Sequence, residues 1–315
     1  MATNKLFIPD LDRTKTIQVM KKKINAVVLV FSFLLLTIAT ACTNTEDNKI
    51  ISDDIRFCES TYPYENGILI ANFGCDQLNP MNREGKGYIL YYRKGKTNMF
   101  IPADGNLSAP KGMFEKDGYL YICDVNKIVV YNLQSLNESP QIILFPNDDL
   151  FLNDLAASGN TLYVSVTNSG RIYQLDISDP TNLRDSQLVE WLNVEGPNGI
   201  LIDGNSMYIA SYPADGETSE LNVIYKVEDL NKPVAKPIYS VPGQYDGIAL
   251  SDDKTTLYVS NWTPAEVIAI NIKDGQTTKL SLCNQLIGPA DMTLKNGNLY
   301  IPDLPNSRVL IHKLP

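Results

Sequence analysis

The stretch Thr161-Leu162-Tyr163-Val164-Ser165-Val166 decides the fold, because its Leu-Tyr-Val core is one of six copies of the same short phrase. The other copies are Ile68-Leu69-Ile70, Leu120-Tyr121-Ile122, Met207-Tyr208-Ile209, Leu257-Tyr258-Val259 and Leu299-Tyr300-Ile301. They return at intervals of about 45 residues, the length of one four-stranded sheet in a radial repeat protein. The sequence therefore predicts an all-β fold, a six-bladed β-propeller over residues 50–315.

Each repeat divides into an inner strand A, a turn, a strand B that carries the phrase, a strand C and an outer strand D. In the third repeat we expect strand A at Leu152–Ala157, the turn at Ser158–Asn160, strand B at Thr161–Val166 and strand C at Gly170–Ile177. The turn residues and the β-branched and aromatic runs on either side support this division.

The sixth repeat ends after three strands, which we place at Met292–Lys295, Asn298–Ile301 and Arg308–Lys313. The segment Ile50–Phe57 precedes the first repeat and is free to supply the missing outer strand. Its pairing with Val309–Lys313 would join the first and last blades and remove a free sheet edge. We therefore predict that an N-terminal strand closes the last blade.

Residues 1–41 are typical of a secretory signal region. A basic cluster, Lys21–Lys23, is followed by the apolar run Ala26–Ile38 and by small residues. This run is short for a membrane span. Because Met20 stands just before the lysines, residues 1–19 are a possible upstream extension.

Cys42 directly follows Ala39-Thr40-Ala41, which resembles a bacterial lipoprotein signal. The resemblance implies that Cys42 is lipidated and that residues 42–49 form a polar tether. An uncleaved single-span anchor is the alternative. Either way, the expected location is that of a membrane-anchored protein, facing the periplasm or at the cell surface.

Charge and histidine content exclude several classes of function. Without residues 1–41 the chain keeps 21 basic and 34 acidic residues, a net charge of about −13, which argues against a nucleic-acid partner. The only histidine, His312, falls in the last predicted strand, so a Ser-His-Asp triad, a Cys-His dyad and a histidine zinc site have no support. No glycine-rich phosphate loop is present.

Four cysteines follow Cys42, in a compartment where disulfides can form. Cys58 and Cys75 flank the first phrase and are the favoured pair, while other pairings of these two with Cys123 and Cys283, or free thiols, stay open.

Oxygen-bearing side chains recur at the start of strand A, about ten residues before each phrase. This first set is Glu59, Lys111 (the one side chain without oxygen), Asn153 with Asp154, Asn198, Asp246 and Asp291. A second set ends strand B and consists of Asn72, Asp124, Ser211, Asn261 and Asp303. We expect both sets to converge near the propeller axis.

Carboxylates that share a narrow channel repel one another unless a cation lies among them. Hard oxygen ligands favour calcium, magnesium or manganese, with zinc possible. The alternative is structural, since Asn-Gly and Asp-Gly are ordinary turn formers. Two long connections, Phe73–Lys86 and Pro213–Glu220, overhang the same face and either are simply tolerated there or shape access to a site.

Three segments resemble the ligand motifs of the gluconolactonase or regucalcin-like (senescence marker protein) family of six-bladed propellers. They are Cys58-Glu59-Ser60, Pro197-Asn198-Gly199-Ile200 and Tyr245-Asp246-Gly247-Ile248. The resemblance implies one divalent cation held in the central channel by Glu59, Asn198 and Asp246.

The family also has an Arg-x-Asn-Asp-Gly segment that contacts substrate, and Phe151–Leu155 matches it in part. Asn153 is retained and is implied to bind substrate, whereas Phe151 replaces the arginine and Leu155 the glycine. The lost arginine favours a substrate less anionic than a sugar acid.

The resemblance implies a metal-dependent hydrolase of a small lactone or ester. The cation would polarise the carbonyl group, and Asp246 would be both a ligand and the catalytic general base. The alternative is a non-catalytic, NHL-like propeller that binds a glycan, a peptide or a protein partner at the cell surface.

Overall fold

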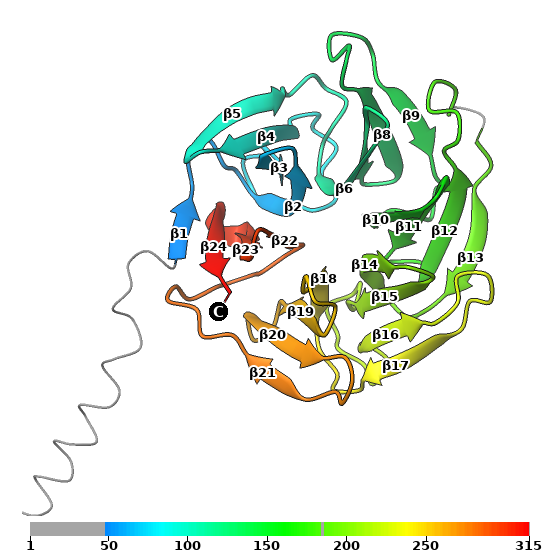
Figure 1. The fold of residues 1–315 in the computed structure, drawn as a ribbon. Helices are drawn as coiled ribbons and strands as arrows, with labels where there is room; N and C mark the ends of the chain where they lie inside the picture. Colours follow the sequence, from blue (N-terminus) through cyan, green and yellow to red (C-terminus); the bar gives the residue numbers. More distant parts are fainter. Residues whose placement is uncertain (1–47, 184–185, 315) are drawn as a thin grey trace, which may run out of the picture. The chain divides into compact units, whose positions relative to one another are not determined.

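We describe the protein from a computed structural model, which covers residues 48–183 and 186–314. Six four-stranded antiparallel sheets stand in a ring with their first strands at the centre (Figure 1). The predicted six-bladed β-propeller is therefore confirmed. The predictions for the signal region 1–41, its possible extension 1–19, Cys42 and most of the tether lie outside the described residues. Within the described ranges, no helix is long and apolar enough to span a membrane.

The first three blades follow one another along the chain. Blade 1 contains β2 (Cys58–Tyr64), β3 (Gly67–Asn72), β4 (Tyr88–Arg93) and β5 (Lys96–Ile101). Blade 2 contains β6 (Pro110–Lys116), β7 (Tyr119–Asp124), β8 (Lys127–Asn132) and β9 (Gln141–Leu144). Blade 3 contains β10 (Leu152–Ser158), β11 (Thr161–Val166), β12 (Arg171–Asp176) and β13 (Val189–Asn193).

The remaining blades complete the ring. Blade 4 contains β14 (Pro197–Asp203), β15 (Ser206–Ser211), β16 (Ile224–Val227) and β17 (Ala235–Tyr239). Blade 5 contains β18 (Tyr245–Leu250), β19 (Thr256–Asn261), β20 (Glu266–Asn271) and β21 (Thr277–Lys279). Blade 6 contains β22 (Thr293–Lys295), β23 (Asn298–Asp303), β24 (Arg308–Lys313) and β1 (Asn48–Ile51), and the short 3₁₀ turn η1 (Leu304–Asn306) follows β23.

The repeated phrase lies on the second strand of each blade and is apolar throughout because both faces of that strand are covered. In blade 3, Leu162 and Val164 pack into the cluster shared with blade 2, whereas Tyr163 packs into the cluster shared with blade 4. Consecutive side chains of a strand point to opposite faces, so a run of apolar residues fills two inter-blade cores at once. Tyr163 also meets Trp191 edge-on, with ring centroids 4.8 Å apart.

The ring is closed as predicted, with a shorter and earlier N-terminal strand than expected. β1 pairs antiparallel with β24, from Asn48 opposite His312 to Ile51 opposite Val309. The chain then leaves the sheet in a polar turn, where Asp54 has a φ of 60°. The predicted strand at Ile50–Phe57 therefore ends at Ile51, because a residue in the left-handed region cannot continue the ladder.

A β-bulge interrupts the inner strand of blades 1 to 5 at the same register. The pairing shifts between Cys58 and Ser60 in blade 1, and equivalent shifts occur in β6, β10, β14 and β18. A bulged residue is released from the ladder, and its side chain takes a new direction. The first predicted set of side chains, apart from Asp291 of blade 6, lies at these bulges.

Candidate metal-binding pocket

A pocket of about 140 Å³ lies over the inner strands, and five blades supply its polar residues. They are Glu59, Lys111, Asn153, Asn198 and Asp246, each from the bulge of its own inner strand. Its remaining walls are largely apolar and consist of Phe73, Leu78, Pro80, Phe151, Tyr212, Trp262 and Leu304. The structure thus brings together all four residues that the sequence predicted as ligands or substrate contacts.

Four buried oxygen atoms of this pocket have no hydrogen-bond partner in the described structure. They are Glu59 Oε2, Asn153 Oδ1, Asn198 Oδ1 and Asp246 Oδ1. Leaving such atoms unpaired is costly, and native proteins normally pair them with a protein group, water or an ion. The donor set of two carboxylates and two amide oxygens suits a hard divalent cation such as calcium.

No group of three or more His, Cys, Asp or Glu side chains forms a metal centre within the described ranges. The candidate set contains only two acids, Glu59 and Asp246, so amide oxygens must complete it. The orphaned Oδ1 of Asn153 stands with the two acids and Asn198. This arrangement supports a ligand role for Asn153 in place of the substrate contact that the resemblance implied.

Burial and mutual repulsion favour the neutral forms of the acids. Burial, followed by the charge of Asp246, raises the pKa of Glu59 well above its ordinary value. Burial, with a smaller contribution from Asp154, raises the pKa of Asp246 to about 7, and the nearby Lys111 opposes this shift. A cation among these groups would restore the charged forms.

Asp291 does not take the pocket position that the sequence assigned to it. In blade 6, Pro289 forms an isolated antiparallel β-bridge with Asp303, in the same register as the pairing of Pro110 with Asp124 in blade 2. The register equivalent of Lys111 is therefore Ala290. Asp291 lies one residue further along, does not line the pocket, and accepts a hydrogen bond from the Ser60 hydroxyl at 2.7 Å.

Asp154 likewise serves the framework. One carboxylate oxygen accepts the N–H of Ile200 at 2.8 Å and the other accepts the N–H of Leu155 at 2.7 Å. The carboxylate thus ties the bulge of blade 3 to the inner strand of blade 4, and it does not line the pocket.

The glycines that follow the site residues allow neighbouring inner strands to approach closely. A Cβ on Gly247 would lie 2.6 Å from Asp291 Cα, and one on Gly112 would lie 2.6 Å from Asp154 Cα. Gly112, Gly199 and Gly247 lie within strands and have no positive φ. The turn-former explanation for the Asn-Gly and Asp-Gly pairs is therefore wrong, because these glycines are required by close backbone contact.

The second predicted set has a structural role and does not line the pocket. Asp124 accepts hydrogen bonds from the N–H groups of Ser108 and Ala109 at 3.1 and 2.6 Å, directly before β6. Bonds to the segment before the inner strand are also made by Asn72, Ser211, Asn261 and Asp303. The expectation that both sets converge on the site is corrected: the second set holds the backbone that presents the first.

The apolar walls were missed by the sequence reasoning, although a signal for them exists. Phe73, Tyr212, Trp262 and Leu304 each directly follow a member of the second set. The polar residue ends strand B by bonding backbone, and the next side chain is then free to turn over the pocket. Three of these four positions carry an aromatic ring.

Lys111 is the only positively charged residue that lines the pocket within the described part of the chain. Its side chain is fully buried, and its ammonium group donates to the carbonyls of Pro80 and Ala109 at 3.1 and 3.2 Å. The nitrogen lies 5.0 Å from the ring centroid of Phe151 and 5.6 Å from that of Phe73. Burial lowers the pKa of Lys111, and the charge of Glu59 opposes this effect.

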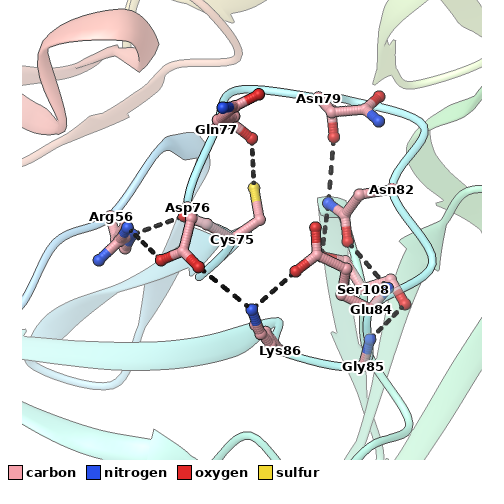
Figure 2. Close-up of polar contacts among 10 residues, drawn as sticks. All are labelled: Arg56, Cys75, Asp76, Gln77, Asn79, Asn82, Glu84, Gly85, Lys86 and Ser108. Carbon is pink, nitrogen blue, oxygen red and sulfur yellow. Dashed lines mark hydrogen bonds and ion pairs between the residues drawn. The ribbon is translucent and has the colours of Figure 1, made fainter.

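The long connection of blade 1, residues 73–86, covers the pocket and is held in place by polar contacts. Its residues Phe73, Leu78 and Pro80 line the pocket. Figure 2 shows its polar fastenings. Asp76 lies between Arg56 and Lys86, at 2.6 and 3.5 Å. These links favour the second interpretation of this connection, that it shapes access. The connection 213–220 of blade 4 contributes no lining residue.

The favoured Cys58–Cys75 disulfide is absent, and Cys58, Cys75 and Cys123 are buried thiols outside any disulfide. The Cys58 thiol donates to the carbonyl of Arg308 at 3.1 Å, and the Cys75 thiol donates to that of Gln77 at 3.0 Å. Each thiol therefore already has its own acceptor, the first on β24 of blade 6 and the second in the long connection of blade 1. Its burial raises the pKa of Cys58, which disfavours the thiolate needed for oxidation. His312 lies on β24, away from the pocket lining.

The fold and pocket define a six-bladed β-propeller with a buried, oxygen-lined central site. No protein-family model matches the chain, and no curated protein matches it. Three solved structures share the fold. A gluconolactonase from Xanthomonas campestris is 15% identical with a TM-score of 0.62, over 86% of this chain and 90% of that one.

The other two are more distant. The nidogen/laminin complex gives 14% identity and a TM-score of 0.55, over 85% of this chain and 94% of the matched one. A structural genomics protein of unknown function from Bacteroides thetaiotaomicron gives 10% identity and 0.55, over 85% and 72%. At these identities the likeness shows the fold alone, and the regucalcin-like assignment stays a prediction.

Proposed function

We propose that the propeller binds one divalent cation, calcium in the first place, through Glu59, Asn153, Asn198 and Asp246. The observation that carries this proposal is the cluster of four buried oxygen atoms without partners, one from each of four blades. Calcium accepts carboxylate and amide oxygens in irregular geometries, whereas magnesium demands a stricter octahedron. Magnesium, manganese and zinc are the competitors to be tested.

We further propose that the site hydrolyses a small lactone or ester. When bound, the cation supplies a Lewis acid that polarises the substrate carbonyl. The carboxylate of Asp246, which a bound cation would keep ionised, would take a proton from the attacking water. The apolar walls bind the hydrocarbon part of the substrate, and the cover at 73–86 excludes bulk water.

The chain attaches to a membrane in this proposal, through a lipid on Cys42, and faces the periplasm or the cell exterior. Incorporation of a labelled fatty acid into the full chain, and its loss in Cys42→Ser, tests the attachment without reference to catalysis.

The metal test is isothermal titration of the full chain with calcium, magnesium, manganese and zinc, followed by turnover of a panel of small lactones and esters. We expect calcium to bind and to be required for turnover, and both to be lost in Asp246→Ala. Asp203→Ala is the matched control, since Asp203 ends β14, the inner strand of the neighbouring blade 4, and bonds Lys254 outside the pocket. If calcium binds and no ester or lactone is turned over, the non-catalytic, NHL-like binding role replaces the hydrolase. If no cation binds, the metal proposal is wrong.

A further inference from the structure

One group of the pocket has no part in the proposed cation site. Lys111 reaches the pocket from the bulge of β6, between the blades that supply Glu59 and Asn153. Its ammonium group carries three N–H donors, of which two are used by the carbonyls of Pro80 and Ala109. One donor therefore has no protein acceptor among the described residues.

The charge of Lys111 is also uncompensated at close range. No ion pair joins it to a carboxylate within the described ranges, although the charges of Glu59, Asp124 and Asp246 act on it. Of these, Asp124 is already paired with Lys127 at 3.4 Å. Its immediate surroundings are two carbonyl oxygens and the faces of Phe73 and Phe151. These contacts hold the ammonium group in place and solvate it in part, but they do not neutralise it.

A bound divalent cation would leave the charge of Lys111 without a compensating negative charge. The two carboxylates of the proposed ligand set would balance the two charges of the cation. The charge of Lys111 would then be left over in a small, buried and mostly apolar space. A buried charge of this kind is stable only when a partner arrives with the ligand.

We infer that Lys111 is a specificity-determining residue that selects a small, monoanionic substrate, whose carboxylate binds the free N–H of Lys111 while its reacting carbonyl faces the cation that the four orphaned oxygens would hold. This inference rests on the proposed function. Because Phe151 replaces an arginine of the resembling family, the sequence predicted a less anionic substrate. The inference reverses this expectation, since Lys111 of blade 2 gives the pocket a positively charged side chain. The aromatic walls add a preference for a substrate with an apolar segment between its carboxylate and its reacting carbonyl.

The test compares benzoate with benzamide, which have nearly the same shape and differ in charge. Both are titrated calorimetrically into the calcium-saturated full chain. We expect benzoate to bind about ten-fold more tightly than benzamide, as for one charge-assisted hydrogen bond. Lys111→Met should bring the two affinities within about two-fold of each other. Lys111→Gln, which keeps an N–H donor for the carbonyls, is the second variant should the first fail to fold.

The calcium affinity of the Lys111 variants shows whether Lys111 recognises the carboxylate of the substrate or only supports the shape of the pocket. Removal of a neighbouring positive charge should leave calcium binding intact or strengthen it, whereas a collapsed pocket would weaken it. Lys116→Met is the matched control, because Lys116 ends the same strand and bonds Gly159 and Asn160 outside the pocket. This control should keep the calcium affinity and the benzoate-to-benzamide affinity ratio of the unmodified protein.

The outcomes are distinct. Calcium binding with equal affinities for benzoate and benzamide in the unmodified protein would overturn the inference alone. An undiminished preference for benzoate in both Lys111 variants would do the same. Failure of calcium to bind would overturn the proposed function and, with it, this inference.

Discussion

The Ser60 hydroxyl donates a 2.7 Å hydrogen bond to Asp291 across 231 positions of sequence, at the seam where blade 1 meets blade 6. The backbone N–H of Asp291 also bonds the carbonyl of Glu59 at 3.0 Å. The first inner strand, which carries a proposed ligand, is thus tied directly to the last blade. Closure of the ring and geometry of the pocket are therefore coupled.

Closure by β1 can be tested at two adjacent isoleucines. Ile51 is 5% exposed and packs with Val309 and Ile311, while Ile50 is 44% exposed. We expect Ile51→Ala to lower the free energy of unfolding by about 2–4 kcal/mol, and Ile50→Ala to change it by less than about 1 kcal/mol. Chemical denaturation of both variants measures the difference. Equal losses would show that β1 does not seal the ring.

The proposed ligand set predicts a calcium-dependent stabilisation that single ligand changes abolish. Glu59→Gln and Asp246→Asn each remove one of the two negative charges of the set, and we expect each to weaken calcium binding about 100-fold or more. The melting temperature should rise with calcium in the unmodified protein and stay nearly constant in the variants. Asp203→Asn serves as the control of equal charge change. A calcium response retained in Asp246→Asn would exclude that residue as a ligand.

The metal-free protein should lose stability as the pH rises from about 4 to 7. The folded pKa of Asp246 is about 7, against an ordinary value of 3.8, so between these values the folded state binds more protons than the unfolded state. Glu59 is shifted in the same direction. Exposed acids with lowered pKa values, such as Asp179, act at lower pH and do not enter this window.

Thermal melts in a chelator across this pH range measure the effect, and calcium should reverse it because the cation requires deprotonated ligands. Asp246→Asn should make the chelator curve less steep, and the raised pKa values of Glu59, Asp154 and Asp291 should account for the slope that remains. A melting temperature that climbs with pH in the chelator would contradict the raised pKa values.

The cover at 73–86 is expected to depend on one buried amide. Asn82 donates to the carbonyls of Asn79 and Ser108, at 3.0 and 3.1 Å, and accepts the N–H of Glu84 (Figure 2). Asn82→Ala should destabilise the covered state by about 1–3 kcal/mol and speed amide hydrogen exchange across residues 73–86.

Asn79→Ala is the control in the same loop, because the Asn79 side chain holds only the exposed N–H of Met81. Exchange that is equally fast in both variants would show that Asn82 does not fasten the cover.

Much of the fold follows from the sequence alone. The phrase at Leu162–Val164 and its five relatives predict six blades, because a run of apolar residues on a short strand needs cover on both faces. The three-stranded last repeat predicts closure, since an unpaired edge such as that of β24 must find a partner. Local pattern suffices for these conclusions. The end of β1 at Ile51 was misplaced, because nothing in the pattern of residues 50–57 shows that Asp54 adopts a positive φ.

The sequence also pointed to the members of the candidate site, because Glu59, Asn153, Asn198 and Asp246 lie about ten residues before their copies of the phrase. Only the tertiary structure decided which polar residues are available for chemistry. Asp124 and Asp154 are aspartates that are as regularly spaced as Asp246, yet backbone N–H groups satisfy them. Hydrogen-bond satisfaction depends on contacts between strands and between blades, so spacing cannot reveal it. For the same reason Lys111 could be counted from the sequence, but its position beside the oxygen set, buried and without a carboxylate partner, is a property of the folded ring.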